Sequence, residues 1–196
     1  MNKKESIIKA ALDEFSQNDY EQASINKIIK EAKTSKGNFY HYFKNKEELY
    51  MALVSEAFQK KLECVINVKT DDFFGRLQHQ IMNGIRFAKD YPAYYQLSRR
   101  FAKEKGSDIY NRVMIEIVDC NKVDETNAFL VNSYQKQLID NDYPLEFVQK
   151  VMYYAFENIN DAIEQENMEL SNIQKTLDLT IKLLKNGLQA KDSLHK

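Results

Sequence analysis

The sequence predicts an all-α protein, and three observations support this prediction. Two prolines and five glycines occur in 196 residues, whereas the helix-forming residues Lys, Glu, Gln, Leu, Ile and Ala are plentiful. Hydrophobic residues make up 43% of the chain, which is enough to fill a core. Apolar residues recur at helical spacing along most of the chain. We therefore expect a small three-helix domain at the N-terminus followed by a longer helical domain.

The first fifty residues predict three short helices. The first covers about residues 4–17 and ends near Asn18. Ser24 is a good N-cap for the second helix, and Thr34 or Ser35 for the third, because a side-chain oxygen can accept a hydrogen bond from a free N–H of the first turn. The apolar residues expected to pack together are Ile7, Ile8, Ala11, Leu12, Phe15, Ile25, Ile28, Ile29, Ala32, Phe39 and Phe43.

Longer helices are expected in the rest of the chain. Small and polar residues interrupt the helical pattern between them, as at Gly106-Ser107-Asp108. The last two helices each carry a wide apolar stripe. The expected helices run from Asn45 or Lys46 to about Val65, over 73–91, from Pro92 onward, over 109–139, across 148–163, and from a Ser171 cap to about Leu188.

Positive charge is concentrated in one short segment. The whole chain has a formal net charge of −1, which by itself gives no reason to expect a nucleic-acid partner. Between Lys27 and Lys46, however, six lysines stand against the single acid Glu31. From Met51 to the end, 19 basic residues stand against 21 acidic ones. The basic residues therefore gather where a DNA-binding surface would need them.

A specific motif lies across the second and third expected helices. Residues 35–49 read S-K-G-N-F-Y-H-Y-F-K-N-K-E-E-L, and Ala23-Ser24-Ile25 leads into the second helix. Over residues 5–53 the chain resembles the DNA-binding domain of the TetR family of bacterial regulators. The resemblance implies a helix-turn-helix DNA-binding domain at 1–47 and a helical effector-binding and dimerisation domain at 48–196.

The physics of a helix-turn-helix gives these residues roles. The second of its two helices lies in the major groove, where the first residues meet base edges. Lys36 can donate to guanine, Asn38 to a base edge or a phosphate, and Gly37 allows close approach of the backbone. Hydroxyls, ammonium groups and helix N-termini are the usual phosphate contacts. The predicted DNA-binding set is Ser24, Asn26, Lys27, Ser35, Lys36, Gly37, Asn38, Tyr40, His41, Tyr42, Lys44 and Lys46.

Two features of this motif have other readings. Taken singly, Lys36 is more often a solvated surface residue and Tyr40 more often a core residue; the combination is what favours DNA binding. At the position of Lys33 the family usually has glycine. A left-handed backbone at this turn would cost lysine about 1 kcal/mol.

Binding to two half-sites requires a symmetric dimer, because one helix-turn-helix reads only a few base pairs. The last two helices can pair with their two-fold mates as a four-helix bundle, which is also the arrangement that the resemblance implies. Alternatively, the two stripes serve only the core of the protomer. The residues predicted at the dimer interface are Val148, Met152, Phe156, Ile159, Ile181 and Leu184.

The middle of the chain is rich in aromatic residues, which predicts a pocket for an aromatic or lipophilic small-molecule effector. An ordinary helical core would use the same residue types. A nearby arginine could hold an acidic group of the effector. The predicted ligand-binding residues are Phe87, Tyr94, Tyr95, Arg99, Phe129, Tyr134 and Tyr153.

Other classes of function are disfavoured. No nucleophile with a plausible base, no glycine-rich phosphate loop and no paired Cys or His spacing is present, so we expect neither an enzyme nor a cofactor or metal site. A signal peptide and a membrane-spanning run are also absent, so a bacterial cytoplasmic protein is expected. The expected function is a ligand-responsive transcriptional repressor that binds a palindromic operator as a homodimer; an activator or a chromosome-organising protein of the same fold is the alternative.

Overall fold

The computed structural model describes residues 2–65, 73–118, 131–132, 134–136, 142–164 and 170–188. Every regular element in these ranges is a helix, which confirms the all-α prediction. The chain forms two compact units, residues 1–64 with 86–121 and residues 65–85 with 122–196. The predicted domain boundary at residue 47 stays a prediction.

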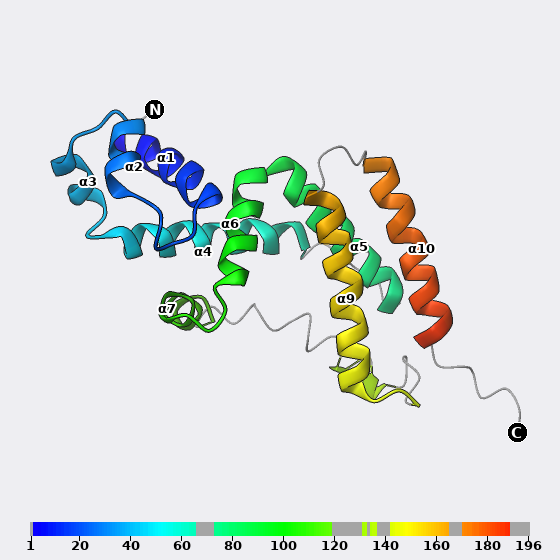
Figure 1. Ribbon diagram of the computed structural model, residues 1–196. Helices are drawn as coiled ribbons and strands as arrows, with labels where there is room; N and C mark the ends of the chain where they lie inside the picture. The colour runs from blue at the N-terminus through cyan, green and yellow to red at the C-terminus, as the bar shows by residue number, and fades with distance from the viewer. Residues whose placement is uncertain are drawn as a thin grey trace, which may run out of the picture. The chain divides into compact units, whose positions relative to one another are not determined.

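The first three helices are α1 (Lys3–Gln17), α2 (Ile25–Glu31) and α3 (Lys36–Tyr42). We call residues 2–53 the head; in it α1 packs against both α2 and α3 (Figure 1). Polar caps define the three starts, because each satisfies a backbone N–H that the first turn leaves unpaired. Asn2 forms a capping box with Glu5 on α1, Ser24 caps α2 and Ser35 caps α3.

The turn between α2 and α3 contains a left-handed residue. Lys33 has a φ of 48°, and it is the one non-glycine residue with a positive φ in the described part of the chain. This conformation lets the N–H of Thr34 donate to the carbonyl of Ile29 at 3.2 Å, which closes the C-terminal end of α2. The turn therefore has the left-handed backbone whose cost was considered above, with lysine in place of glycine.

The rest of the first unit comprises α4 (Lys46–Val65), α6 (Pro92–Lys103) and α7 (Asp108–Val118), together with the last residues of α5. As expected, proline stands at the start of α6. Because α6 packs along α1, the core of the head continues into the helices that come after it. Large fully buried side chains in this core are Phe15, Phe39, Leu49, Tyr50, Leu53, Leu97 and Phe101.

The second unit is built from most of α5 (Phe73–Asp90), α9 (Leu145–Glu164) and α10 (Leu170–Leu188). The helices α9 and α10 run side by side (Figure 1). Since α10 begins at Leu170, Ser171 lies inside the helix and is not its cap as predicted. Of the long helix predicted over 109–139, the structure describes α7 as far as Val118 and the helical residues 131–132 and 134–135; most of the remainder lies outside the described residues. Among the described helices, none is both long and apolar enough to cross a bilayer.

Candidate nucleic-acid interface

The helix α3 is anchored by one apolar residue and exposed elsewhere. Phe39 is completely buried, and Phe43 is buried just after the helix ends. The Ser35 hydroxyl accepts a hydrogen bond from the backbone N–H of Asn38 at 3.1 Å. The buried Phe39 and Phe43 therefore fix one face of α3, and the Ser35 cap fixes its N-terminal end. The exposed residues of α3 are Lys36, Gly37, Asn38, Tyr40, His41 and Tyr42.

Gly37 has no steric reason to be glycine within its own chain. A Cβ built at this position would meet one side-chain atom, the Ser35 hydroxyl oxygen, at 3.9 Å, which is an ordinary van der Waals distance. Glycine inside a helix costs about 1 kcal/mol relative to alanine. The bare backbone at Gly37 thus gives no advantage inside the protomer, but it would let a duplex approach α3 closely.

Next to Gly37, a cation and a phenol share one exposed face. The Lys36 ammonium lies 5.9 Å from the centre of the Tyr40 ring, one helical turn along. Tyr40 is 45% exposed although its ring stands edge-on against Phe39 at 5.2 Å. Both groups can therefore reach DNA from a helix that is fixed in the core.

The N-terminus of α2 is locked to α1 by a buried carboxylate. Glu14 is 6% exposed; its side chain accepts from the backbone N–H of Ser24 at 3.1 Å and pairs with the Lys27 ammonium at 2.6 Å. The Ser24 hydroxyl in turn accepts from the N–H of Lys27 at 3.4 Å. The Lys27 side chain is still 54% exposed, and Asn26 beside it is exposed as well. The first turn of α2 is thus a fixed site where polar groups face solvent.

Lys46 has a different role from the phosphate contact expected of it. Its ammonium donates to the backbone carbonyls of Tyr20, Glu21 and Ala23 at 2.7, 3.2 and 3.2 Å. It also lies 4.5 Å from the centre of the Tyr20 ring. Because these carbonyls use all three ammonium donors, Lys46 fastens the loop between α1 and α2. Lys44, which is exposed, is the better placed of the two for a phosphate.

Two residues that the sequence did not indicate, one in α6 and one at its C-terminal end, hold the same loop. Arg100 donates to the carbonyl of Ser16 at 2.9 Å and to the Asp19 carboxylate at 2.8 Å. Glu104 accepts from the backbone N–H of Tyr20 at 2.8 Å and from the Tyr50 hydroxyl at 3.0 Å. Burial and the Glu104 carboxylate raise the pKa of Tyr50 above its ordinary value, so the phenol stays a donor. These contacts join positions 54 to 84 residues apart, so no local pattern could indicate them.

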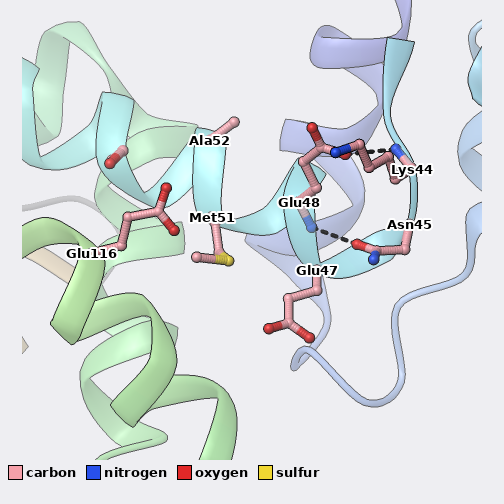
Figure 2. A pocket seen from close by; sticks show the side chains of 8 residues that line it. Lys44, Asn45, Glu47, Glu48, Met51, Ala52 and Glu116 are labelled. Atoms are coloured by element: carbon pink, nitrogen blue, oxygen red, sulfur yellow. Dashed lines mark hydrogen bonds between the residues drawn. The ribbon is translucent and has the colours of Figure 1, made fainter. Parts of the chain in front are cut away.

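One cavity of about 440 Å³ lies between the start of α4 and α7, and Figure 2 shows its acidic lining. Glu47 is held by Arg112 at 2.6 and 3.2 Å, and the Glu48 carboxylate accepts from the backbone N–H of Lys44 at 2.6 Å. An acidic cavity does not suit DNA or a lipophilic effector. Its lining residues are Lys44, Asn45, Glu47, Glu48, Met51, Ala52, Ser55 and Glu116.

The residues predicted to bind an effector belong to different units. Phe87 is buried, and burial with a hydrogen bond to Glu56 raises the pKa of Tyr94. These two, with Tyr95 and Arg99, belong to the first unit. In the second unit, the Tyr134 hydroxyl donates to the carbonyl of Tyr143 at 2.8 Å. Tyr153 is 60% exposed, and Phe129 lies outside the described residues. The effector pocket stays a prediction.

Four of the residues predicted at the dimer interface lie in the core of their own unit. They are between 0 and 7% exposed and pack in one apolar cluster, so the stripes serve the protomer, which was the alternative reading. Phe156 and Ile159 have side chains outside the described part of the chain. The large apolar side chains that do face solvent on α10 are Leu179 and Leu183, 60% and 74% exposed and one helical turn apart. The four buried residues are Val148, Met152, Ile181 and Leu184.

Comparisons with known proteins agree with this geometry. A family model described as bacterial regulatory proteins, tetR family, matches residues 7–53, which include α2, α3 and the turn between them. The HTH-type transcriptional regulator YuxN of Bacillus subtilis is 40% identical over 68 residues, 35% of this chain and 23% of that protein. The HTH-type transcriptional regulator QacR of Staphylococcus aureus is 27% identical over 160 residues, 67% of this chain and 84% of that protein.

The likeness in fold extends over nearly the whole chain. A TetR family transcriptional regulator from Chloroflexus aurantiacus has a TM-score of 0.79 at 21% sequence identity, covering 96% of this chain and 94% of that one. Matches to the first curated relatives are shorter: they span between 23% and 47% of the length of those proteins. The family model thus covers only the head, whereas the likeness in fold extends over the rest of the chain as well.

Proposed function

The chain belongs to the TetR family of bacterial regulatory proteins, and on that premise we propose that it is a cytoplasmic transcriptional repressor that binds a palindromic operator as a homodimer. A small-molecule effector releases it. The observation that carries this proposal is the N-terminal end of α3, where Lys36, Gly37 and Asn38 are exposed on a helix fixed by Phe39.

In this proposal α3 lies in the major groove. The Lys36 ammonium donates to guanine O6 and N7, and Asn38 contacts a base edge, because these are the acceptors that the groove presents. The bare backbone of Gly37 lets both side chains come within hydrogen-bond distance. Around them, Ser24, Lys27 and other exposed polar groups hold phosphates and set the register. The remaining phosphate contacts are Asn26, Ser35, Tyr40, His41, Tyr42 and Lys44.

The dimer forms through α9 and α10 of two copies. Their buried stripes already fill the core of each protomer, so the contact between copies uses the exposed apolar side chains Leu179 and Leu183. Antiparallel pairs of helices from two protomers then make a four-helix bundle. A two-fold axis through it matches half-sites centred about 34 Å apart on the operator.

Release by an effector is a shift between two populations. The effector binds the helical region after the head and favours a conformation in which the spacing of the two reading helices no longer fits the operator. The change reaches the head through α4 and through the contacts of Arg100 and Glu104 with the loop after α1. Couplings of about 1–3 kcal/mol lower affinity about 5- to 150-fold, which is enough for release.

Selection of bound sequences from random duplex DNA tests the proposal. We expect the purified protein to recover one inverted repeat whose half-sites lie one helical turn apart. A Lys36→Ala variant should recover a more degenerate half-site, because a base contact is lost. Recovery of no consensus by the wild-type protein at moderate salt would contradict sequence-specific regulation. A consensus without two-fold symmetry would contradict the dimer.

A further inference from the structure

Lys33 has a strained backbone conformation at a turn that does not require a lysine. Its φ of 48° lies in the left-handed region, where an L-residue with a Cβ is disfavoured and glycine is not. The turn itself needs only the left-handed backbone, since its hydrogen bonds join main-chain atoms of Lys33 and Thr34 to carbonyls of α2. A glycine would make the same bonds without strain. The lysine side chain therefore adds nothing to this turn that offsets its conformational cost.

A second lysine lies against the same turn. The Lys3 ammonium, at the N-terminal end of α1, is 3.5 Å from the backbone carbonyl oxygen of Lys33. The capping box between Asn2 and Glu5 fixes this end of α1, with bonds of 2.9 and 3.0 Å between their backbone and side-chain atoms. Both lysines are exposed. The Lys3 ammonium and the backbone of Lys33, 30 residues apart in sequence, thus lie together at one edge of the head.

Two other lysines of the head have partners within the protein. Lys27 pairs with Glu14, and Lys46 donates to three carbonyls. In contrast, none of the ion pairs or hydrogen bonds described for the head involves the Lys33 ammonium. Glu31, two residues earlier, is exposed and lines a groove with residues of α1. The charge of Lys33 is therefore available to an anion that the protein itself does not supply.

The place of the turn indicates which anion this is. Lys33 lies two residues before Ser35, which caps α3. An α-helix with its side chains, about 10–12 Å across, fills a major groove about 12 Å wide. If α3 lies in the groove, the turn that enters it lies against one of the two phosphate walls.

We propose that Lys33 and Lys3 form a phosphate-binding site at the turn between α2 and α3, and that its ligand is the DNA backbone beside the reading helix. This inference rests on the proposed DNA binding of α3. The left-handed backbone at Lys33 makes the turn less stable. Lysine occurs there because its side chain adds a contact with the duplex.

Replacement of Lys33 separates strain from charge. Lys33→Gly removes both, Lys33→Asn removes the charge but tolerates the left-handed backbone, and Lys33→Arg keeps the charge. Lys3→Gln tests the second cation. Lys103→Gln, at an exposed lysine of α6, is the control for a loss of one positive charge elsewhere. Melting temperature and affinity for a selected operator duplex are measured at several salt concentrations.

Stability and DNA binding should change in opposite directions. We expect Lys33→Gly to raise the melting temperature by about 2–4 °C. The same variant should lose about tenfold in affinity at low salt, and the slope of log affinity against log salt should fall by about two per dimer, one contact per protomer. Lys33→Asn and Lys3→Gln should lower affinity and slope, whereas Lys33→Arg and Lys103→Gln should leave the slope unchanged.

The possible results separate the phosphate site from the proposed DNA binding by α3. If the wild-type protein binds the operator but Lys33→Gly and Lys33→Asn bind with the same affinity and slope, the phosphate site is wrong and the proposed function stands. An equal loss of slope in Lys103→Gln would reduce the effect to net charge and would also overturn the site. If the wild-type protein binds no duplex, both proposals fail.

Discussion

The head and the second unit use their apolar residues in different ways. In the head, a few buried side chains such as Phe15 and Phe39 hold short helices whose other faces are polar and exposed. In the second unit, the apolar stripes of α9 and α10 are directed inward and fill the core of that unit. The first arrangement presents polar and charged side chains on a fixed apolar base, whereas the second fills a core.

This difference teaches which sequence signals can be trusted. Exposed basic and aromatic side chains on a short capped helix are not needed for folding, so their presence indicates a binding partner. An apolar stripe is ambiguous, because a protomer core and a dimer interface need the same residue types. Exposure in the structure decides between them, residue by residue.

Truncation on the two faces of α10 should give the largest contrast. Leu177 is fully buried, so Leu177→Ala should lower the free energy of unfolding by about 2–5 kcal/mol. Leu183 is 74% exposed in the protomer, so Leu183→Ala should weaken the dimer more than the fold. Urea denaturation over a range of protein concentrations, with sedimentation of both variants, measures these effects. A dimer unaffected by Leu183→Ala and Leu179→Ala would move the interface away from this face.

Removal of the buried carboxylate in the head should have the next largest effect. Glu14→Ala leaves the N–H of Ser24 and the Lys27 ammonium without their partner, and it should cost about 2 kcal/mol of stability. The exposed neighbour Asp13 is the matched control, since Asp13→Ala should change stability by less than about 0.5 kcal/mol. If Glu14→Ala and Asp13→Ala have equally small effects on thermal and urea unfolding, Glu14 does not lock α2 to α1.

The smallest effect on stability is expected at Gly37, where a substitution should stabilise the fold and weaken DNA binding. Because a Cβ there meets only the Ser35 hydroxyl oxygen, Gly37→Ala should stabilise the head by up to about 1 kcal/mol. The same change should weaken binding to the operator, since the methyl group stands between α3 and the duplex. Gly187→Ala, at a helical glycine in the second unit whose Cβ would meet nothing, is the control. Unchanged operator affinity in Gly37→Ala would contradict close approach of the backbone at this position.

Much of the head could be predicted because its signals are local. Ser24 and Ser35 cap the helices that begin after them, and Asn18 ends α1, as their side chains and positions indicated. For Lys33 the resemblance indicated the cost of a left-handed backbone but did not decide whether the turn adopts it. The roles of Lys46, Arg100 and Glu104 could not be predicted, because each depends on a loop brought near by tertiary packing.

The second unit was harder to predict because one pattern serves two purposes. The stripe on α9 and α10 was expected at a dimer interface, yet Val148, Met152, Ile181 and Leu184 lie in the core of the protomer. Periodicity gives the face of a helix but does not say what covers it. The cap at Ser171 was misplaced because the helix begins at Leu170, within the one or two residues by which helix boundaries usually vary.

The ratio of affinities for operator and random duplexes tests the central claim, that α3 reads bases while its surroundings hold phosphates. We expect Lys36→Ala to lower this ratio, because about 1–3 kcal/mol of discrimination is lost with a base contact. Lys44→Ala should weaken binding to both duplexes equally and make the affinity less dependent on salt concentration. Equal losses on operator and random DNA for Lys36→Ala would contradict base reading by α3.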